Sequence, residues 1–173
     1  MKNKLTLSKQ CAMRQHKGQY RKNNKTPYWH HLRDVVNNLE MMGIKDESIL
    51  CAGWLHDSIE DTSFDYDDVS KFFGKKVAQI VSDLTKETRL PKNQQEQNYL
   101  KQLAKSSWQS KIVKFADILA NVSDLKNSEL NQKQKIIQVK YKIKYLGVIK
   151  SGIVENKNKI PNLFEAQNLL NSV

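Results

Sequence analysis

Apolar residues recur at intervals of three and four along most of the chain, which is the spacing of one face of an α-helix. The clearest example is the run Leu32, Val35, Val36 and Leu39. Gly43 follows where a helix of that length is expected to end. The next segment, residues 49–57, is apolar on nearly every side, so we expect a central helix there, with Asp46 as its cap.

The same spacing continues through the rest of the chain. Asp65 is expected to cap a helix that Gly74 interrupts, and a second stripe follows over residues 77–84. The polar stretch 86–97 predicts a loop. Further helices are expected over residues 112–119, over 136–146 with a lysine-rich outer face, and after Pro161. With few glycines and prolines and no repeat or linker, the sequence predicts an all-α, single-domain helical bundle over residues 1–173.

The composition is ordinary for a soluble protein, with 39% hydrophobic and 27% charged residues, but the net charge is +11. This charge favours polyanionic partners, which include nucleotides, nucleic acids and acidic membranes, and a solvated lysine surface explains it equally well. The start lacks the apolar core of a signal peptide, and no stretch approaches the roughly 18 apolar residues of a membrane span. We therefore expect a cytoplasmic protein. Cys11 and Cys51, which form no CxxC motif, predict reduced core thiols rather than a disulfide framework or zinc knuckle.

Four ionisable residues gather at the end of the apolar segment 49–57, as His56-Asp57 followed by Glu60-Asp61. In a continuous helix, each residue of the first pair stands four positions before one of the second, so both pairs project toward one surface. A buried carboxylate without a partner costs several kcal/mol or becomes protonated. A histidine beside a carboxylate suits a divalent cation, with the second acidic pair within reach of a water at the ion.

Three places along the chain are expected to converge on this ion. They are the pair His30-His31 before one helix, His56-Asp57, and Asp117, a lone acid in the apolar segment 112–119. Two imidazoles and two carboxylates form a mixed nitrogen and oxygen site that suits Mn²⁺, Fe²⁺, Mg²⁺ or catalytic Zn²⁺. Such a site leaves positions for water and a phosphate oxygen, which is the arrangement needed to hydrolyse a phosphate ester or anhydride.

The residues around these positions resemble a known family. The matching segments are Arg21-Lys22, Thr26-Pro27-Tyr28 with His31, the string from Leu55 to Thr62, Phe73-Gly74, and Lys114 to Asp117 with Asn121. Together they resemble the hydrolase domain of the RelA/SpoT family, within the HD-domain metal-dependent phosphohydrolases, over residues 11–152. The resemblance is to the stand-alone small alarmone hydrolases. It implies Mn²⁺-dependent removal of the 3′ pyrophosphate from guanosine tetraphosphate and pentaphosphate.

The resemblance also assigns roles to individual residues. The implied metal ligands are His31, His56, Asp57 and Asp117. Glu60 is implied as the leading general base and Asp61 as its partner in positioning the attacking water. The implied nucleotide contacts are Arg21, Lys22 and Asn121, with weaker matches at Lys92 and Tyr141.

Departures from the family keep other functions open. Basic residues are expected around Asn121 and after Lys92, but the chain reads Ile118-Leu119-Ala120 before the asparagine and is uncharged from Asn93 to Gln95. An HD phosphohydrolase acting on NADPH or a nucleoside monophosphate is therefore an alternative. A nucleotide sensor or basic nucleic-acid-binding module is a second, but Glu60 and Asp61 would repel the anion that a pure binder holds. We expect a small nucleotide as the partner, rather than nucleic acid or a membrane.

Overall fold

The computed structural model describes residues 3–126 and 128–172, and the regular elements of this part are helices. They are α1 (Lys4–Gln15), α2 (Trp29–Met41), α3 (Glu47–Leu55), α4 (Ser58–Asp61), α5 (Tyr66–Phe73), α6 (Lys75–Leu84), α7 (Lys92–Lys105), α8 (Trp108–Lys126), α9 (Gln132–Glu155), the 3-10 turn η1 (Lys157–Lys159) and α10 (Leu163–Ser172). The prediction of an all-α fold is confirmed. Their buried side chains form one hydrophobic cluster, and the single-domain organisation stays a prediction. Within the described residues, no helix combines the length and apolar character needed to cross a membrane.

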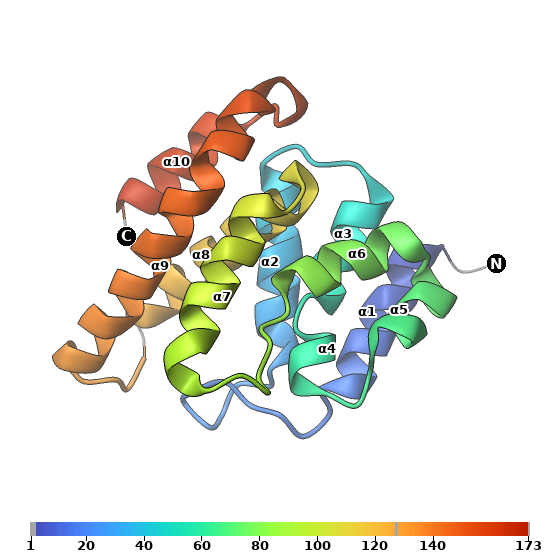
Figure 1. Cartoon of the computed structure of the whole chain (residues 1–173), viewed down its shortest axis with the longest axis horizontal. Helices are drawn as coiled ribbons and strands as arrows, with labels where there is room; N and C mark the ends of the chain where they lie inside the picture. Colours follow the sequence, from blue (N-terminus) through green and yellow to red (C-terminus); the bar gives the residue numbers. More distant parts are fainter. Residues whose placement is uncertain (1–2, 127, 173) are drawn as a thin grey trace.

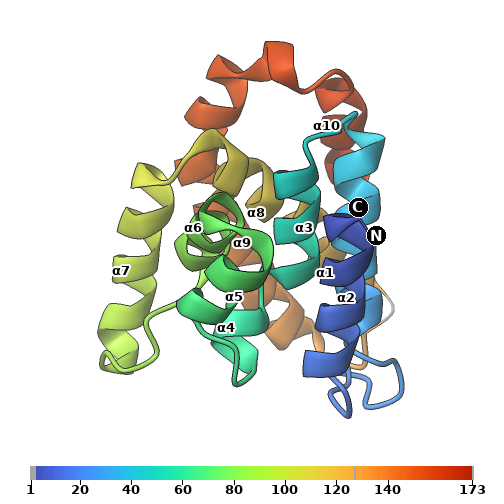
Figure 2. The same ribbon diagram turned by 90° about the vertical axis from the view of Figure 1, so that its right-hand side faces the viewer.

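Helix α3 lies inside the bundle, with α1 and α2 on one side and α6 on the other (Figures 1 and 2). Every residue from Ile49 to Leu55 is buried, which explains why this helix is apolar on all sides. Gly53 allows α2 to approach closely, because a Cβ there would stand 2.8 Å from Leu39 Cδ1. The two helices form a hairpin, so the start of α2 lies beside the end of α3.

Polar residues define where these helices begin and end. Asp46 caps α3 by accepting a hydrogen bond from the amide of Ser48, at 2.8 Å. Asp65 forms a capping box at the start of α5, as its position before that helix predicts. Gly43 and Gly74 both have positive φ angles, +81° and +97°, at the turns that follow α2 and α5.

Helix α8 passes along α2 and carries a buried stretch from Ser110 to Ala120 through the bundle. The side-chain amide of Asn38 on α2 donates to the carbonyl oxygen of Ala116 at 3.0 Å, which fixes the two helices relative to each other. Helix α9 packs against α8 and α7. These contacts place the middle of α8 opposite the hairpin end where α2 starts and α3 stops.

The prediction of a loop over residues 86–97 is wrong beyond Pro91. Helix α7 begins at Lys92, directly after this proline. The helix lies at the edge of the bundle and buries only Tyr99 and Leu103, one turn apart, so its first turns carry no apolar signal. The segment is rich in glutamine, which has good helix propensity, but its polar composition led to the prediction of a loop.

Candidate metal centre

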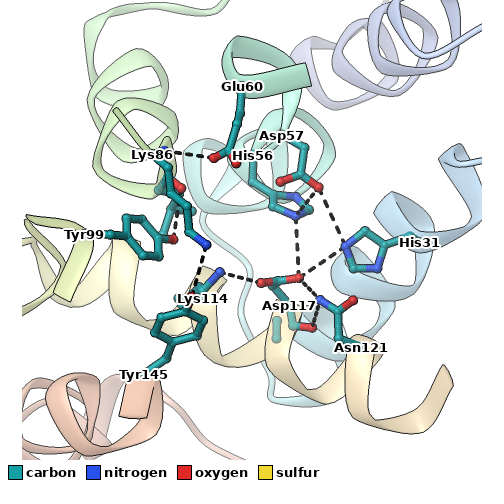
Figure 3. A network of polar contacts seen from close by, with 12 residues as sticks. His31, His56, Asp57, Glu60, Lys86, Tyr99, Lys114, Asp117, Asn121 and Tyr145 are labelled. Carbon is teal, nitrogen blue, oxygen red and sulfur yellow. Dashed lines mark hydrogen bonds and ion pairs between the residues drawn. The ribbon is translucent and has the colours of Figure 1, made fainter. Parts of the chain in front are cut away.

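Three buried side chains from separate helices meet at the end of the α2–α3 hairpin (Figure 3). His31 belongs to the first turn of α2, His56 directly follows α3, and Asp117 lies on α8. One donor atom from each lies within 4.8 Å of the others. The Nε2 atoms of His31 and His56 are 3.2 and 3.8 Å from Asp117 Oδ1. The neighbouring His30 instead packs its ring against Trp29.

Asp57 lies beside this group as a fourth residue. Its Oδ2 atom is 3.0 Å from His56 Nε2 and 3.8 Å from His31 Nε2. The hydroxyl of Tyr28 donates to the same oxygen at 2.6 Å, which fixes the orientation of the carboxylate. The structure therefore brings together all four residues predicted as metal ligands.

The orientation of His56 fits a cation. Its Nδ1 atom lies 3.0 Å from the carbonyl oxygen of Gly53, which only accepts, so the proton is on Nδ1 and Nε2 is left to face the site. Nε2 is buried and has no hydrogen-bond partner in the described structure. Two carboxylates and two ring nitrogens that converge in this way form the donor set expected around a divalent ion.

The ionisation of the residues at the centre also indicates a site for a cation. Burial disfavours the protonated ring of His56, but the charges of Asp57 and Asp117 outweigh burial and raise its pKa to about 9. Burial also opposes ionisation of both carboxylates, yet their cationic neighbours hold the pKa of each well below its usual range. The carboxylates therefore stay charged and demand positive charge between them, which a proton on His56 supplies when no metal is bound.

Lys114 and Asn121 hold Asp117 from the two sides. Lys114 Nζ lies 2.8 Å from Asp117 Oδ2, and the amide of Asn121 donates to Oδ1 and to the main-chain oxygen of the same residue. The ammonium group of Lys114 also lies 5.3 and 5.0 Å from the ring centroids of Tyr99 and Tyr145. The sequence pattern assigns no role to Lys114, although a lysine one turn before an acid in an apolar helix is a signal for such a pair.

The acidic pair lies on α4, next to the metal centre. The backbone amide of Lys86 donates to Glu60 Oε2 at 2.8 Å, and Gln19 Nε2 donates to the carbonyl oxygen of Asp61 at 2.8 Å. Burial is the main cause that raises the pKa of both carboxyl groups, and the charge of Asp57 adds to it. Both groups therefore hold a proton more readily than an exposed carboxyl does.

The predicted continuous helix through residue 57 is wrong, because α3 ends at Leu55 and α4 begins at Ser58. The hydroxyl of Ser58 donates to the carbonyl oxygen of Leu55 at 2.6 Å, and the ring of His56 donates to the carbonyl oxygen of Gly53. Side chains therefore satisfy the last carbonyl groups of α3. The break separates the residues at the centre from the acidic pair on α4.

A pocket opens beside the centre between the segment before α2 and helices α8 and α9. Three of the predicted nucleotide contacts line it, namely Arg21, Lys22 and Asn121. Arg21 Nη2 donates to Asn121 Oδ1 at 3.3 Å and forms an ion pair with Asp124 Oδ2 at 2.5 Å. Helix α9 contributes Gln138 and Lys142, one turn apart.

The other two predicted contacts lie outside this pocket. Lys92 is exposed at the first position of α7. Tyr141 is 38% exposed on α9, with Lys144 over its ring, and does not line the pocket. A role in binding stays a prediction for both residues.

The HD domain family model matches residues 9–143 of the chain. The chain belongs to the HD domain family. The predicted resemblance to this family is thereby confirmed. An HD domain implies binding of a divalent metal, and His31, His56 and Asp117 form a group that could hold the ion.

The chain is also similar to named relatives. The chain is 38% identical over 118 residues to guanosine-3′,5′-bis(diphosphate) 3′-pyrophosphohydrolase MESH1 of Drosophila melanogaster and 39% identical over 116 residues to that of Homo sapiens. These matches cover 67% and 66% of this chain, and 66% and 65% of the two relatives, so the chain spans about two thirds of their length. A solved structure, described as a metazoan orthologue of SpoT that hydrolyses ppGpp, superposes with a TM-score of 0.82 at 29% identity and 98% coverage of both chains.

Proposed function

We propose that the chain hydrolyses the 3′ pyrophosphate group of guanosine tetraphosphate (ppGpp) and pentaphosphate, releasing pyrophosphate with GDP or GTP. One observation carries this proposal: the buried group of His31, His56 and Asp117 stands next to an acidic pair and opens beside a basic pocket. The relatives whose names state this activity support the choice of substrate. A phosphohydrolase needs all three parts, namely a cation site, a proton acceptor and groups that hold phosphate.

Mn²⁺ is the proposed metal, held by His31, His56, Asp57 and Asp117. When bound, such a cation lowers the pKa of a water from 15.7 toward about 7 and neutralises phosphate charge. The mixed donor set fits it, because imidazole and carboxylate together suit Mn²⁺ better than a set of thiolates does. Fe²⁺, Mg²⁺ and Zn²⁺ are the competing ions for the same donors.

Glu60 is proposed as the general base and Asp61 as its partner. The raised pKa of Glu60 brings its proton affinity closer to the value that suits proton transfer near neutral pH. The amide of Lys86 binds one carboxylate oxygen of Glu60, which leaves the other oxygen to accept the proton of the attacking water. The proposed role of Arg21 and Lys22 is to neutralise phosphate oxygens while Asn121 positions the nucleotide.

The test is release of pyrophosphate from guanosine tetraphosphate, measured with Mn²⁺ and again with the ion chelated by EDTA. We expect turnover that requires the ion, and parallel assays with NADPH and nucleoside monophosphates should show much lower kcat/KM. Preferential turnover of NADPH or a monophosphate would replace the proposed substrate. Tight binding of guanosine tetraphosphate without any turnover would make the chain a nucleotide sensor.

A further inference from the structure

The cationic side chains of the pocket beside the metal centre differ in whether they are paired with an acid. Of the three cationic side chains that the structure describes in the lining of this pocket, Arg21 shares its charge with Asp124 in an ion pair. Lys22 and Lys142 form no ion pair or hydrogen bond with an acid in the described structure. These two lysines therefore leave the pocket with unpaired positive charge.

Lys142 stands where the pocket meets the metal centre. It lines the pocket from α9, and its ammonium nitrogen lies 5.7 Å from the ring centroid of Tyr145. The same ring lies under Lys114, the residue bound to Asp117. Burial is the main cause that lowers the pKa of Lys142, while the charge of Asp117 opposes that shift and the charges of neighbouring lysines add to it.

Two neighbouring lysines, Lys114 and Lys86, have polar partners, whereas in the described structure Lys142 contacts the ring of Tyr145 but forms no ion pair or hydrogen bond. Lys114 is paired with Asp117, whereas Lys86 donates to the hydroxyl of Tyr145 at 3.1 Å and lies 3.9 Å from Glu96. Partly buried like charges repel one another, and an anion between them relieves that repulsion. Among Lys86, Lys114 and Lys142, the ammonium group of Lys142 is therefore the one that is left for a ligand.

We propose that Lys142 binds a phosphate group of the nucleotide, together with Lys22, where the pocket meets the metal centre. This inference rests on the proposed function and adds to it a substrate-binding residue that neither the motif nor the family resemblance assigns. Lys142 sets affinity for the phosphates, while the nucleoside is held by the rest of the pocket. It also explains how helix α9 supplies positive charge beside Asn121, where residues 118–120 and 122–123 of α8 are uncharged.

The experiment compares Lys142→Met with Lys144→Met, a control on the same helix that removes an equal charge from an exposed position. Calorimetry on metal-free protein in EDTA, with guanosine tetraphosphate as the probe, measures binding without turnover. We expect Lys142→Met to raise Kd about tenfold or more, as for a lost charged hydrogen bond, and Lys144→Met to stay within about twofold of wild type. Lys142→Arg should retain most of the affinity, which distinguishes a charge contact from a packing effect.

Two further measurements separate this inference from the proposed function. Guanosine, which has no phosphate, should bind wild type and Lys142→Met equally, and in the Mn²⁺-loaded enzyme Lys142→Met should raise KM more than it lowers kcat. Equal Kd values for the two methionine variants, or no binding of guanosine tetraphosphate to wild type, would overturn the role of Lys142. Binding that depends on Lys142 without pyrophosphate release would leave it standing and remove the proposed hydrolysis instead.

Discussion

Lys114 Nζ lies 2.8 Å from Asp117 Oδ2 on one face of α8, and both side chains are buried. One carboxylate oxygen of Asp117 is thus bound to a lysine while the other faces His31 and His56. A buried ion pair of this kind strongly destabilises a protein when only one partner is removed, because the other charge is left uncompensated. The pair therefore links the stability of the fold to the charge of the metal centre.

Replacing Lys114 with methionine should lower the free energy of unfolding of the metal-free protein by about 3 kcal/mol. Bound Mn²⁺ supplies positive charge to Asp117, so the deficit should be smaller in the loaded protein. Urea unfolding in EDTA and in excess Mn²⁺ measures both values.

Lys111→Met is the matched control, because Lys111 is also buried on α8 but donates to the neutral carbonyl oxygen of Ala104 at 3.0 Å. The free energy of unfolding of this variant should fall by only about 1 kcal/mol, and the decrease should be the same with and without Mn²⁺. A deficit in Lys114→Met that is the same in both buffers would show that the lysine does not act on the charge of the centre.

Sequence periodicity predicted α2, α5 and α6 but not α1, and the motif predicted residues that the structure brings together, whose role as ligands stays a prediction. His31, His56 and Asp117 stand in the chain order that the family motif requires, and the α2–α3 hairpin brings the first two together. Helix α7 was not predicted, because it buries only two side chains in fourteen residues and so shows little hydrophobic pattern.

The partners of the ligands were harder to predict than the ligands. Tyr28 is 29 positions from Asp57, and its hydrogen bond depends on how the segment before α2 folds across the end of α3. On α9, the pocket receives Lys142 rather than the adjacent Tyr141, and that difference of one position depends on the rotation of α9 against α8. Packing of the whole bundle sets that rotation, so no local motif contains it.

The roles of Asp57 and Glu60 should separate experimentally. Asp57→Ala removes a carboxylate that faces both histidines and should abolish loading with Mn²⁺. Glu60→Gln keeps the size of the side chain but removes the proton acceptor, so it should retain the ion and lower kcat at least about 100-fold. Elemental analysis of the dialysed proteins, together with the pyrophosphate assay, measures both properties. Equal loss of metal in the two variants would contradict this division.

Gln19 should act by positioning the acidic pair. Its side-chain oxygen lies 2.7 Å from His16 Nδ1, and its amide nitrogen donates to the carbonyl oxygen of Asp61. Gln19→Ala removes this link, so we expect kcat to fall about tenfold through misplacement of α4, with metal content unchanged. Gln79→Ala, on the exposed face of α6, is the control and should leave kcat unchanged. Loss of metal from Gln19→Ala would instead assign the glutamine to the integrity of the whole centre.

Asp46 should make the stability of the bundle depend on pH through α3, the helix that leads to His56. Partial burial raises the pKa of its carboxyl group, but hydrogen bonds from Lys76 and from the amide of Ser48 outweigh burial and lower it below the model-compound value of 3.8. A group whose folded-state pKa is depressed stabilises the protein above its unfolded pKa, and this contribution disappears as the pH falls through the folded value.

At pH 7, Asp46→Ala should therefore reduce the free energy of unfolding by about 1 kcal/mol, mainly through loss of the cap, and the difference should shrink below about pH 4. The ion pair with Lys76 is largely exposed and contributes less than about 1 kcal/mol. Asp46→Asn keeps an acceptor for the amide of Ser48 but not the charge, so at pH 7 it should lie between wild type and Asp46→Ala, and its difference from wild type should also shrink below about pH 4. Urea unfolding of the three proteins between pH 3 and 7 measures these differences. A constant gap between wild type and Asp46→Ala across this range would show that ionisation of Asp46 does not stabilise α3.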